Sequence, residues 1–201
     1  AGHNAVKQYG ATVLGAGIDL IVAAVGALTD AALVESLLGS IKPPARLLIP
    51  SGAVAGLDGL LAARTAGLES VTYTSIKPPV AWVGTPAETL LAGTERDRYK
   101  VFFEGTAREA ASAYPQNANV GAAVALAAYP TTAGLDRARV KLVSDPAATG
   151  PLGIIEADGA FGKFRFEILA YASPTNPKTS ALTAHSLLCA ARLGYCFPVT
   201  A

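Results

Sequence analysis

Short apolar segments with strand character alternate with helical segments along this chain, and this alternation constrains the fold most strongly. The predicted strands cover residues 19–24, 46–49, 70–76, 139–144, 153–156 and 161–170, with a turn at Asp158-Gly159 between the last two. The predicted helices cover residues 4–16, 31–38, 52–66, 107–113 and 120–128, and a last helix opens at Thr179 or Ser180 and ends at Gly194. Strands that alternate with helices form sheets covered by helices, and adjacent strands pair antiparallel. The sequence therefore predicts an α/β fold with a mixed sheet.

The composition is rich in core-forming residues and poor in charge. Of the 201 residues, 51% are hydrophobic and 15% are charged, and the net charge is +1. A protein that binds a phosphate backbone needs clustered Lys and Arg, but here Arg96 and Arg98 are interleaved with Glu95 and Asp97. The composition therefore argues against a nucleic-acid partner and favours an α/β protein that hides part of its surface in an oligomer.

The cysteines and the first residues bear on the compartment. Cys189 and Cys196 stand about 10 Å apart at helical spacing, beyond disulfide reach, which indicates free or buried thiols in a reducing cytoplasm. The chain start shows no basic region followed by an apolar one, and the longest apolar run, residues 18–28, contains Asp19 and is far shorter than a membrane span. No Cys/His pair has the spacing of metal ligands. We therefore expect a cytoplasmic protein with no membrane span and no metal.

A polar stretch that contains Asn117 and Asn119 leads into a helix of small apolar residues at 120–128. A helix that is apolar on every side is typically buried, and either asparagine is suited to cap it. The positive end of such a helix suits a carboxylate or a carboxamide. The two alternatives are a ligand site at this helix start and a pair of ordinary caps.

The chain resembles the L-aspartate dehydrogenase family over nearly its whole length, because several strings occur in the family's order. They are Val25-Gly26-Ala27-Leu28, residues 49–58 (IPSGAVAGLD), residues 77–82 (KPPVAW), residues 103–120, Asp145-Pro146, residues 159–162 (GAFG) and residues 176–180 (NPKTS). No single string identifies the family, but the ordered set of strings is specific for it. The resemblance implies oxidation of L-aspartate to iminosuccinate with NAD or NADP, in which the cofactor supplies the chemistry and the protein supplies orientation and a proton acceptor.

The resemblance also implies a domain organisation. Residues 1–50 resemble the C-terminal part of a Rossmann-like nucleotide-binding domain, residues 51–178 resemble an α/β catalytic and dimerisation domain with a mixed sheet, and the last helix, about 179–201, is expected to pack back on the first part. Gly15-Ala16-Gly17 precedes a strand instead of following one, so it does not match the glycine turn of a dinucleotide site. We therefore expect the N-terminal part of the Rossmann domain to be missing, weak NAD binding by this chain alone, and a homodimer formed through its second half.

Four candidate cofactor contacts lie in the matched strings. The resemblance implies contacts at Ala53, in the turn beside the nicotinamide, and at Asn119. Gly52 lets the backbone approach a flat ring closely, in a turn expected to follow a strand and open a helix. Gly26 ends a predicted strand, where ligands of open α/β sheets bind.

Three basic residues in the matched strings are candidate substrate contacts. Lys77, Lys178 and Arg108 are suited to bind the carboxylates of L-aspartate or of a related amino or keto acid. The alternative is that they are ordinary solvated side chains.

The sequence departs from the family at the catalytic position. The family has a histidine in an Asn-Val-His string shortly after Asp145-Pro146, and here Gly153 takes its place while Pro151 replaces the asparagine. Glycine accepts no proton, so we expect very weak aspartate oxidation even after the missing nucleotide-binding part is restored, and a gain from Gly153→His combined with Pro151→Asn. The alternatives are an impaired or non-catalytic dimeric homologue and a reductase of a different imine or keto acid. His185 is expected to be a core or interface histidine, and His3 precedes the first helix.

Overall fold

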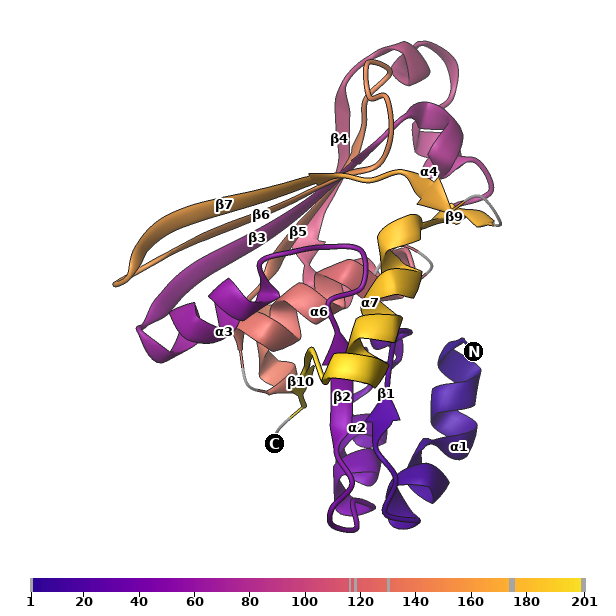
Figure 1. Ribbon diagram of the computed structural model, residues 1–201. Coiled ribbons are helices and arrows are strands. Elements are labelled where there is room, and N and C mark those ends of the chain that lie inside the picture. Colours follow the sequence, from indigo (N-terminus) through magenta and orange to yellow (C-terminus); the bar gives the residue numbers. More distant parts are fainter. Residues whose placement is uncertain (1, 116, 118, 130, 174–175, 200–201) are drawn as a thin grey trace.

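The computed structural model describes residues 2–115, 117, 119–129, 131–173 and 176–199 and confirms the α/β class. Within these residues, a sheet of five strands and a smaller sheet of three strands lie at opposite ends of the molecule, with helices between and beside them (Figure 1). Buried apolar side chains from both sheets and their helices belong to one core cluster. A site between the sheets is therefore held by a continuous packed interior.

The smaller sheet contains strands from both ends of the described chain. Strand β1 (Leu20–Ile21) runs parallel to β2 (Leu47–Pro50), and β10 (Cys196–Pro198) pairs antiparallel with β2 on its other side. Helices α1 (His3–Gly15) and α2 (Ala31–Gly39) pack beside this sheet, and a 3₁₀ turn, η1 (Val25–Thr29), precedes α2. Asp30 caps α2 by accepting a hydrogen bond from the Leu33 N–H at 3.2 Å.

The larger sheet is mixed, as the sequence predicts. Its strands are β3 (Leu68–Lys77), β4 (Lys100–Thr106), β5 (Arg139–Ser144), β6 (Leu152–Gly159) and β7 (Gly162–Leu169). The order is β4-β5-β3-β6-β7, in which only the β3–β5 pair is parallel. Strand β7 therefore lies at an edge of this sheet.

Small residues let the helices approach one face of the larger sheet. Helix α6 (Asn119–Ala128) is buried from Gly121 to Ala128, and a Cβ added at Gly121 would come within 3.0 Å of Val140 on β5. Helix α3 (Leu57–Thr65) packs beside α6, and α5 (Ala107–Ala113) follows β4 directly. A capping box between Thr106 and Glu109 explains the start of α5, because each side chain accepts from the other's backbone N–H.

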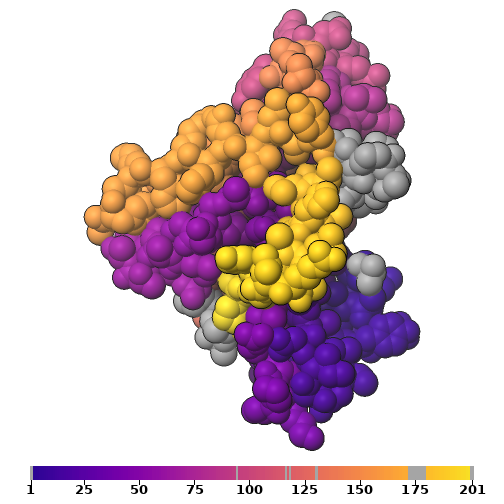
Figure 2. Space-filling model, viewed as in Figure 1, coloured from indigo at the N-terminus to yellow at the C-terminus, as the bar shows by residue number. Residues whose placement is uncertain are grey.

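The chain returns to the smaller sheet through its last helix. A short ribbon of β8 (Ala172–Ser173) and β9 (Asn176–Ser180) leads into α7 (Ala181–Leu193). Ser180 caps the start of α7, and Gly194 ends it in the left-handed conformation with a φ of 71°. Helix α7 lies across the junction between the two sheets, as the yellow segment of Figure 2 shows.

The polypeptide between β3 and β5 adds short elements beyond one end of the larger sheet. These are η2 (Pro79–Trp82), α4 (Ala87–Leu90) and η3 (Gly93–Asp97). The turn η4 (Thr132–Asp136) follows α6 and packs against α5, α6 and η1 instead. Along the described residues, no helix has the length and apolar character needed to span a membrane.

Two local predictions are wrong. The helix expected from residue 52 begins only at Leu57, and the preceding Gly56 has a φ of 80° with the Phe166 ring packed against it. The turn expected at Asp158-Gly159 lies at Ala160-Phe161 instead. Strand β6 continues through Gly159 because that residue pairs with both Leu68 on β3 and Gly162 on β7.

Candidate active site

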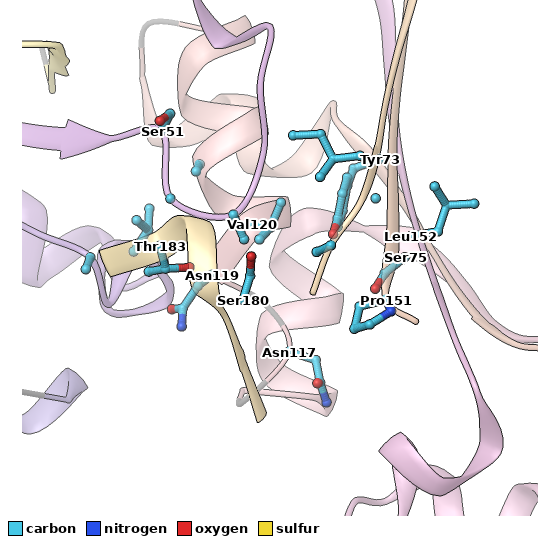
Figure 3. Close-up of a pocket in the computed structure, with 18 of the residues that line it drawn as sticks. Ser51, Tyr73, Ser75, Asn117, Asn119, Val120, Pro151, Leu152, Ser180 and Thr183 are labelled. Atoms are coloured by element: carbon cyan, nitrogen blue, oxygen red, sulfur yellow. The ribbon is translucent and has the colours of Figure 1, made fainter. Parts of the chain in front are cut away.

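A cavity of about 210 Å³ opens where the two sheets, α6 and α7 meet (Figure 3). Its walls come from segments far apart in the sequence: the ends of β1 and β2, the inner face of β3, the starts of α6 and α7, and the β6–β7 pair. Known sites for drug-sized ligands usually measure about 300–1,000 Å³. This smaller volume suits a small polar molecule beside one end of a larger ligand.

Three polar side chains of strand β3, at every second position, face the cavity. Tyr73, Ser75 and Lys77 all line the cavity, because every second residue of a strand points to the same face. Tyr73 and Ser75 are buried. Burial raises the pKa of Tyr73 to about 12, so its hydroxyl keeps its proton at neutral pH.

Lys77 is held between an amide and an aromatic ring. Its Nζ donates a hydrogen bond to the Asn117 Oδ1 at 3.1 Å and lies 4.9 Å from the centroid of the Trp82 ring. Among the described side chains, no carboxylate forms a salt bridge with Lys77. Burial therefore lowers the pKa of Lys77 below its usual range, since the charged form loses solvent without gaining an anion.

Asn119 connects the start of α6 to the segment after β1. Its Oδ1 accepts a hydrogen bond from the Gly26 N–H at 2.8 Å and lies 3.2 Å from the His3 Nε2. A Cβ added at Gly26 would come within 3.1 Å of this oxygen, so only glycine allows so close an approach. The sequence left a ligand site and a pair of ordinary caps as alternatives for Asn117 and Asn119, and in the structure their side-chain oxygens accept hydrogen bonds from Lys77 and Gly26.

The loop after β2 forms another wall of the cavity. Ser51, Gly52 and Ala53 line it, and the Gly52 N–H donates to the Ser186 Oγ on α7 at 3.1 Å. Gly52 has a φ of 67°, and a Cβ added there would meet no atom within 4 Å. Glycine is therefore required here by the backbone conformation, and its absent side chain leaves the loop open toward a ligand.

Two helices begin at the cavity. Asn119 and Val120 come from the first turn of α6, and Ser180 and Thr183 come from the start of α7 (Figure 3). Each helix N-terminus carries partial positive charge and free N–H groups. Together with the Lys77 amine, they make the cavity favourable for a ligand with negative charge.

Gly153 lies on the cavity wall directly opposite Ser75 in the β3–β6 pair. A Cβ added there would lie 3.5 Å from the Tyr73 hydroxyl and 3.6 Å from Val54, which are ordinary van der Waals distances. A side chain at position 153 would therefore project into the cavity without a steric conflict.

Five of the candidate residues predicted from sequence line this one cavity: Gly52, Ala53, Lys77, Asn119 and Gly153. Gly26 lies behind it and contacts it through Asn119. Lys178 belongs to β9, and its side chain lies outside the described part of the structure.

Arg108 lies elsewhere. Its guanidinium donates to both oxygens of Asp136, at 2.7 and 3.0 Å, and to the backbone carbonyls of Thr29 and Thr132. These bonds tie α5 to η1 and η4. The structure therefore gives Arg108 a structural role in place of the predicted substrate contact.

The two histidines differ from their predicted surroundings. His185 is exposed on α7, so the prediction of a core histidine is wrong and only the interface alternative stays. His3 is the first residue of α1 and, through Asn119, lies just behind the cavity wall.

Tyr73, Ser75 and Thr183 line the cavity but were not predicted to do so. The signal was present on β3, where polar residues alternate on what becomes the buried face of a strand. Polar side chains on a buried face need a partner or a ligand, so such an alternation indicates a site. No comparable local signal marks Thr183.

Comparisons with known proteins agree with this architecture. A family model described as aspartate dehydrogenase, C-terminal, matches residues 58–193. The L-aspartate dehydrogenase of Ruegeria pomeroyi is 47% identical over 193 residues, which cover 96% of this chain and 69% of the relative. That of Pseudomonas aeruginosa is 44% identical over 189 residues, covering 94% of this chain and 69% of the relative.

A solved structure shares the fold. The crystal structure of aspartate dehydrogenase from Thermotoga maritima superposes with a TM-score of 0.76 at 29% sequence identity, covering 96% of this chain and 72% of that one. The sequence relatives, the family model and the fold therefore all lead to one assignment. The chain belongs to the L-aspartate dehydrogenase family.

Proposed function

We propose that this protein oxidises L-aspartate to iminosuccinate. The observation that carries the proposal is the convergence of Lys77, the starts of α6 and α7, and the Ser51–Ala53 loop on one small cavity in a chain of this family. A nicotinamide dinucleotide, NAD or NADP, when bound, would accept the hydride from the α-carbon of the substrate. The residues described below bind and orient the two molecules.

The nicotinamide end is proposed to lie against Gly52, Ala53 and Asn119. The open backbone at Gly52 accepts a flat ring, because no atom lies within 4 Å of the place of its missing side chain. Gly26 supports this wall by donating to Asn119. The cavity volume of about 210 Å³ fits one end of a dinucleotide and a small substrate, so the rest of the cofactor would extend along the smaller sheet.

The substrate is proposed to lie between β3 and the helix starts. The N-termini of α6 and α7 favour its carboxylates, and Lys178 on β9, next to the start of α7, is a further candidate for binding one of them. Lys77 is proposed to contact the substrate from the opposite wall. In this arrangement residues 1–50 with the last helix, about 179–201, serve the cofactor, and residues 51–178 serve the substrate and dimerisation.

The assay of this function is NADH or NADPH formation from L-aspartate. We expect L-glutamate, which has one more methylene, to be oxidised with a kcat/KM about 10–200-fold lower, because a small cavity discriminates by size. D-Aspartate serves as the stereochemical control. A clear preference for another amino or keto acid would instead support a reductase of that compound, and no turnover with any of them would support a non-catalytic homologue, the two alternatives that Gly153 favours.

We further propose a homodimer formed through the larger sheet. Strand β7 is an edge strand whose residues are mostly exposed. Leu169, its last residue, and Tyr171, just after it, are 53% and 84% exposed. An unpaired strand edge with exposed apolar side chains tends to recruit another strand or sheet.

Light scattering at micromolar concentration should therefore give twice the mass of one chain. Leu169→Lys should raise the dimer dissociation constant about tenfold or more, because it places an unpaired charge in the contact. Ile18→Lys, at a 58% exposed isoleucine in the first part of the chain, is the matched control and should leave the mass unchanged. A monomeric parent protein would contradict the proposal.

A further inference from the structure

We propose that Lys77 accepts the proton that leaves the substrate amine, in the place where the family resemblance implies a histidine at position 153. This inference rests on the proposed dehydrogenase function and names a proton acceptor, which glycine at position 153 does not provide. It also changes the expectation from sequence alone, since a cavity that contains another proton acceptor does not require the histidine.

The cavity wall leaves few candidates for this role. Among the described residues that line it, Tyr73 and Lys77 are the two with titratable side chains. Tyr73 cannot accept a proton, because with a pKa of about 12 its hydroxyl already carries one. The lowered pKa of Lys77 makes its neutral amine, a good base, available closer to neutral pH than that of an exposed lysine.

Lys77 can reach the space that the histidine would fill. Gly153 pairs with Ser75, and Lys77 is the next residue of β3 on the same face. Diagonal neighbours of this kind have backbones about 7–8 Å apart. A lysine side chain is long enough to span most of that distance, and its amine lies against Asn117, which lines the same cavity as Gly153.

Among the described residues, the side chains in contact with the Lys77 amine are neutral. Asn117 accepts its hydrogen bond, Trp82 lies beneath the amine, and Ser144 of β5 is its partner in the sheet. The acid that follows, Asp145, is bound to Lys77 through the backbone, and its carboxylate accepts from the Ala147 N–H at 2.8 Å. Titration of Lys77 is therefore governed by its burial and by the ligand.

His3 does not replace Lys77 in this role. It is not on the cavity wall, and its Nε2 faces an amide oxygen that already accepts from Gly26.

The proton transfer balances without a further reactant. The neutral Nζ of Lys77 takes one proton from the substrate ammonium group. The nitrogen lone pair so freed would form the C=N bond, and a bound nicotinamide dinucleotide, the sole oxidant, would take the hydrogen of the α-carbon with its bonding electrons. The proton on Nζ then passes to water. Protonated Lys77 cannot act, so kcat/KM should fall as the pH falls through the pKa of Lys77.

Trp82 provides a readout that needs neither cofactor nor substrate. It is the single tryptophan of the chain, it is fully buried, and the Lys77 amine lies 4.9 Å from its ring. Its fluorescence should show a titration step at a pH below the ordinary lysine pKa of about 10.4. The step should persist in Lys42→Met, a control at an exposed lysine, and vanish in Lys77→Met and Lys77→Arg.

Lys77→Arg separates proton transfer from carboxylate binding in the kinetic experiment. Arginine keeps the positive charge but does not deprotonate in this range. We expect it to lose about 10²–10⁴-fold in kcat/KM for L-aspartate and to lose the pH dependence, while succinate, a substrate analogue without the amine, still binds. Lys77→Met should lose the same activity, and Lys42→Met should match the parent.

The outcomes distinguish the two proposals. A parent that oxidises L-aspartate and a Lys77→Arg variant within about threefold of it would overturn the role of Lys77 alone, and would leave Lys77 as a carboxylate-binding cation. The absence of the Trp82 titration step in the parent would also overturn the role of Lys77 as proton acceptor. A parent that binds NAD or NADP and succinate but has no dehydrogenase activity would instead overturn the proposed function, and the role of Lys77 with it.

Discussion

Placing a histidine at position 153 should return about 10²-fold of the aspartate oxidation that Lys77→Met removes. A Cβ at position 153 makes only ordinary contacts, with Tyr73 and Val54, so the imidazole is free to project into the cavity. The new side chain would supply the missing proton acceptor, whose usual contribution is about 10²–10⁴-fold. The measurement is steady-state NADH formation by Lys77→Met with and without Gly153→His and Pro151→Asn.

Pro151→Asn belongs to this variant because proline restricts the backbone two residues before position 153. The Pro151 carbonyl accepts from the Ala170 N–H at 2.7 Å, and asparagine keeps that carbonyl. Gly153→Gln, similar in size but unable to accept a proton at this pH, is the matched control and should restore nothing. Equal recovery with glutamine would show that filling the cavity, and not proton transfer, explains the gain.

Gly56→Ala should destabilise the folded protein by about 2–5 kcal/mol. The residue has a φ of 80°, which costs a residue with a side chain roughly 1–2 kcal/mol. Its Cβ would also overlap the ring of Phe166 on β7, and such overpacking costs typically 1–3 kcal/mol. Urea denaturation of the parent and the variant gives the difference.

Gly84→Ala isolates the backbone part of this effect. Gly84 has a φ of 76°, and a Cβ there would meet no atom within 4 Å. This control should therefore lose only about 1–2 kcal/mol. Combining Gly56→Ala with Phe166→Ala should show a coupling between the two positions, because the second change removes the ring that the first one meets. Equal losses from Gly56→Ala and Gly84→Ala would show that the contact with Phe166 is unimportant.

Much of the fold could be predicted because its signals are local. The start of α2 depends on Asp30, and the limits of α7 depend on Ser180 and Gly194, all of which act within a few residues through capping bonds or a left-handed turn. The alternation on the strands likewise needs only neighbouring residues. The predicted start of α3 was wrong for the opposite reason. Gly56 stays outside the helix and packs against Phe166, which is 110 positions away in the sequence.

The candidate site was predictable in part. Gly52, Ala53, Asn119 and Gly153 were found from strings that resemble the family, and the structure brings them to one cavity. Arg108 was misassigned because its sequence context does not show that Asp136 occupies its guanidinium.

By itself, then, the sequence determined the α/β class, most of the helix and strand positions and the family, because periodicity, caps and ordered strings are properties of short segments. Only the tertiary structure decided which polar groups share a cavity. The register of β3 against β6 places Lys77 diagonally across from Gly153, which has no side chain. The turn η2 places the Trp82 ring next to the lysine amine. The pairing of β3 with β6 joins strands that are distant in sequence, and the burial of Lys77 in the folded protein lowers its pKa.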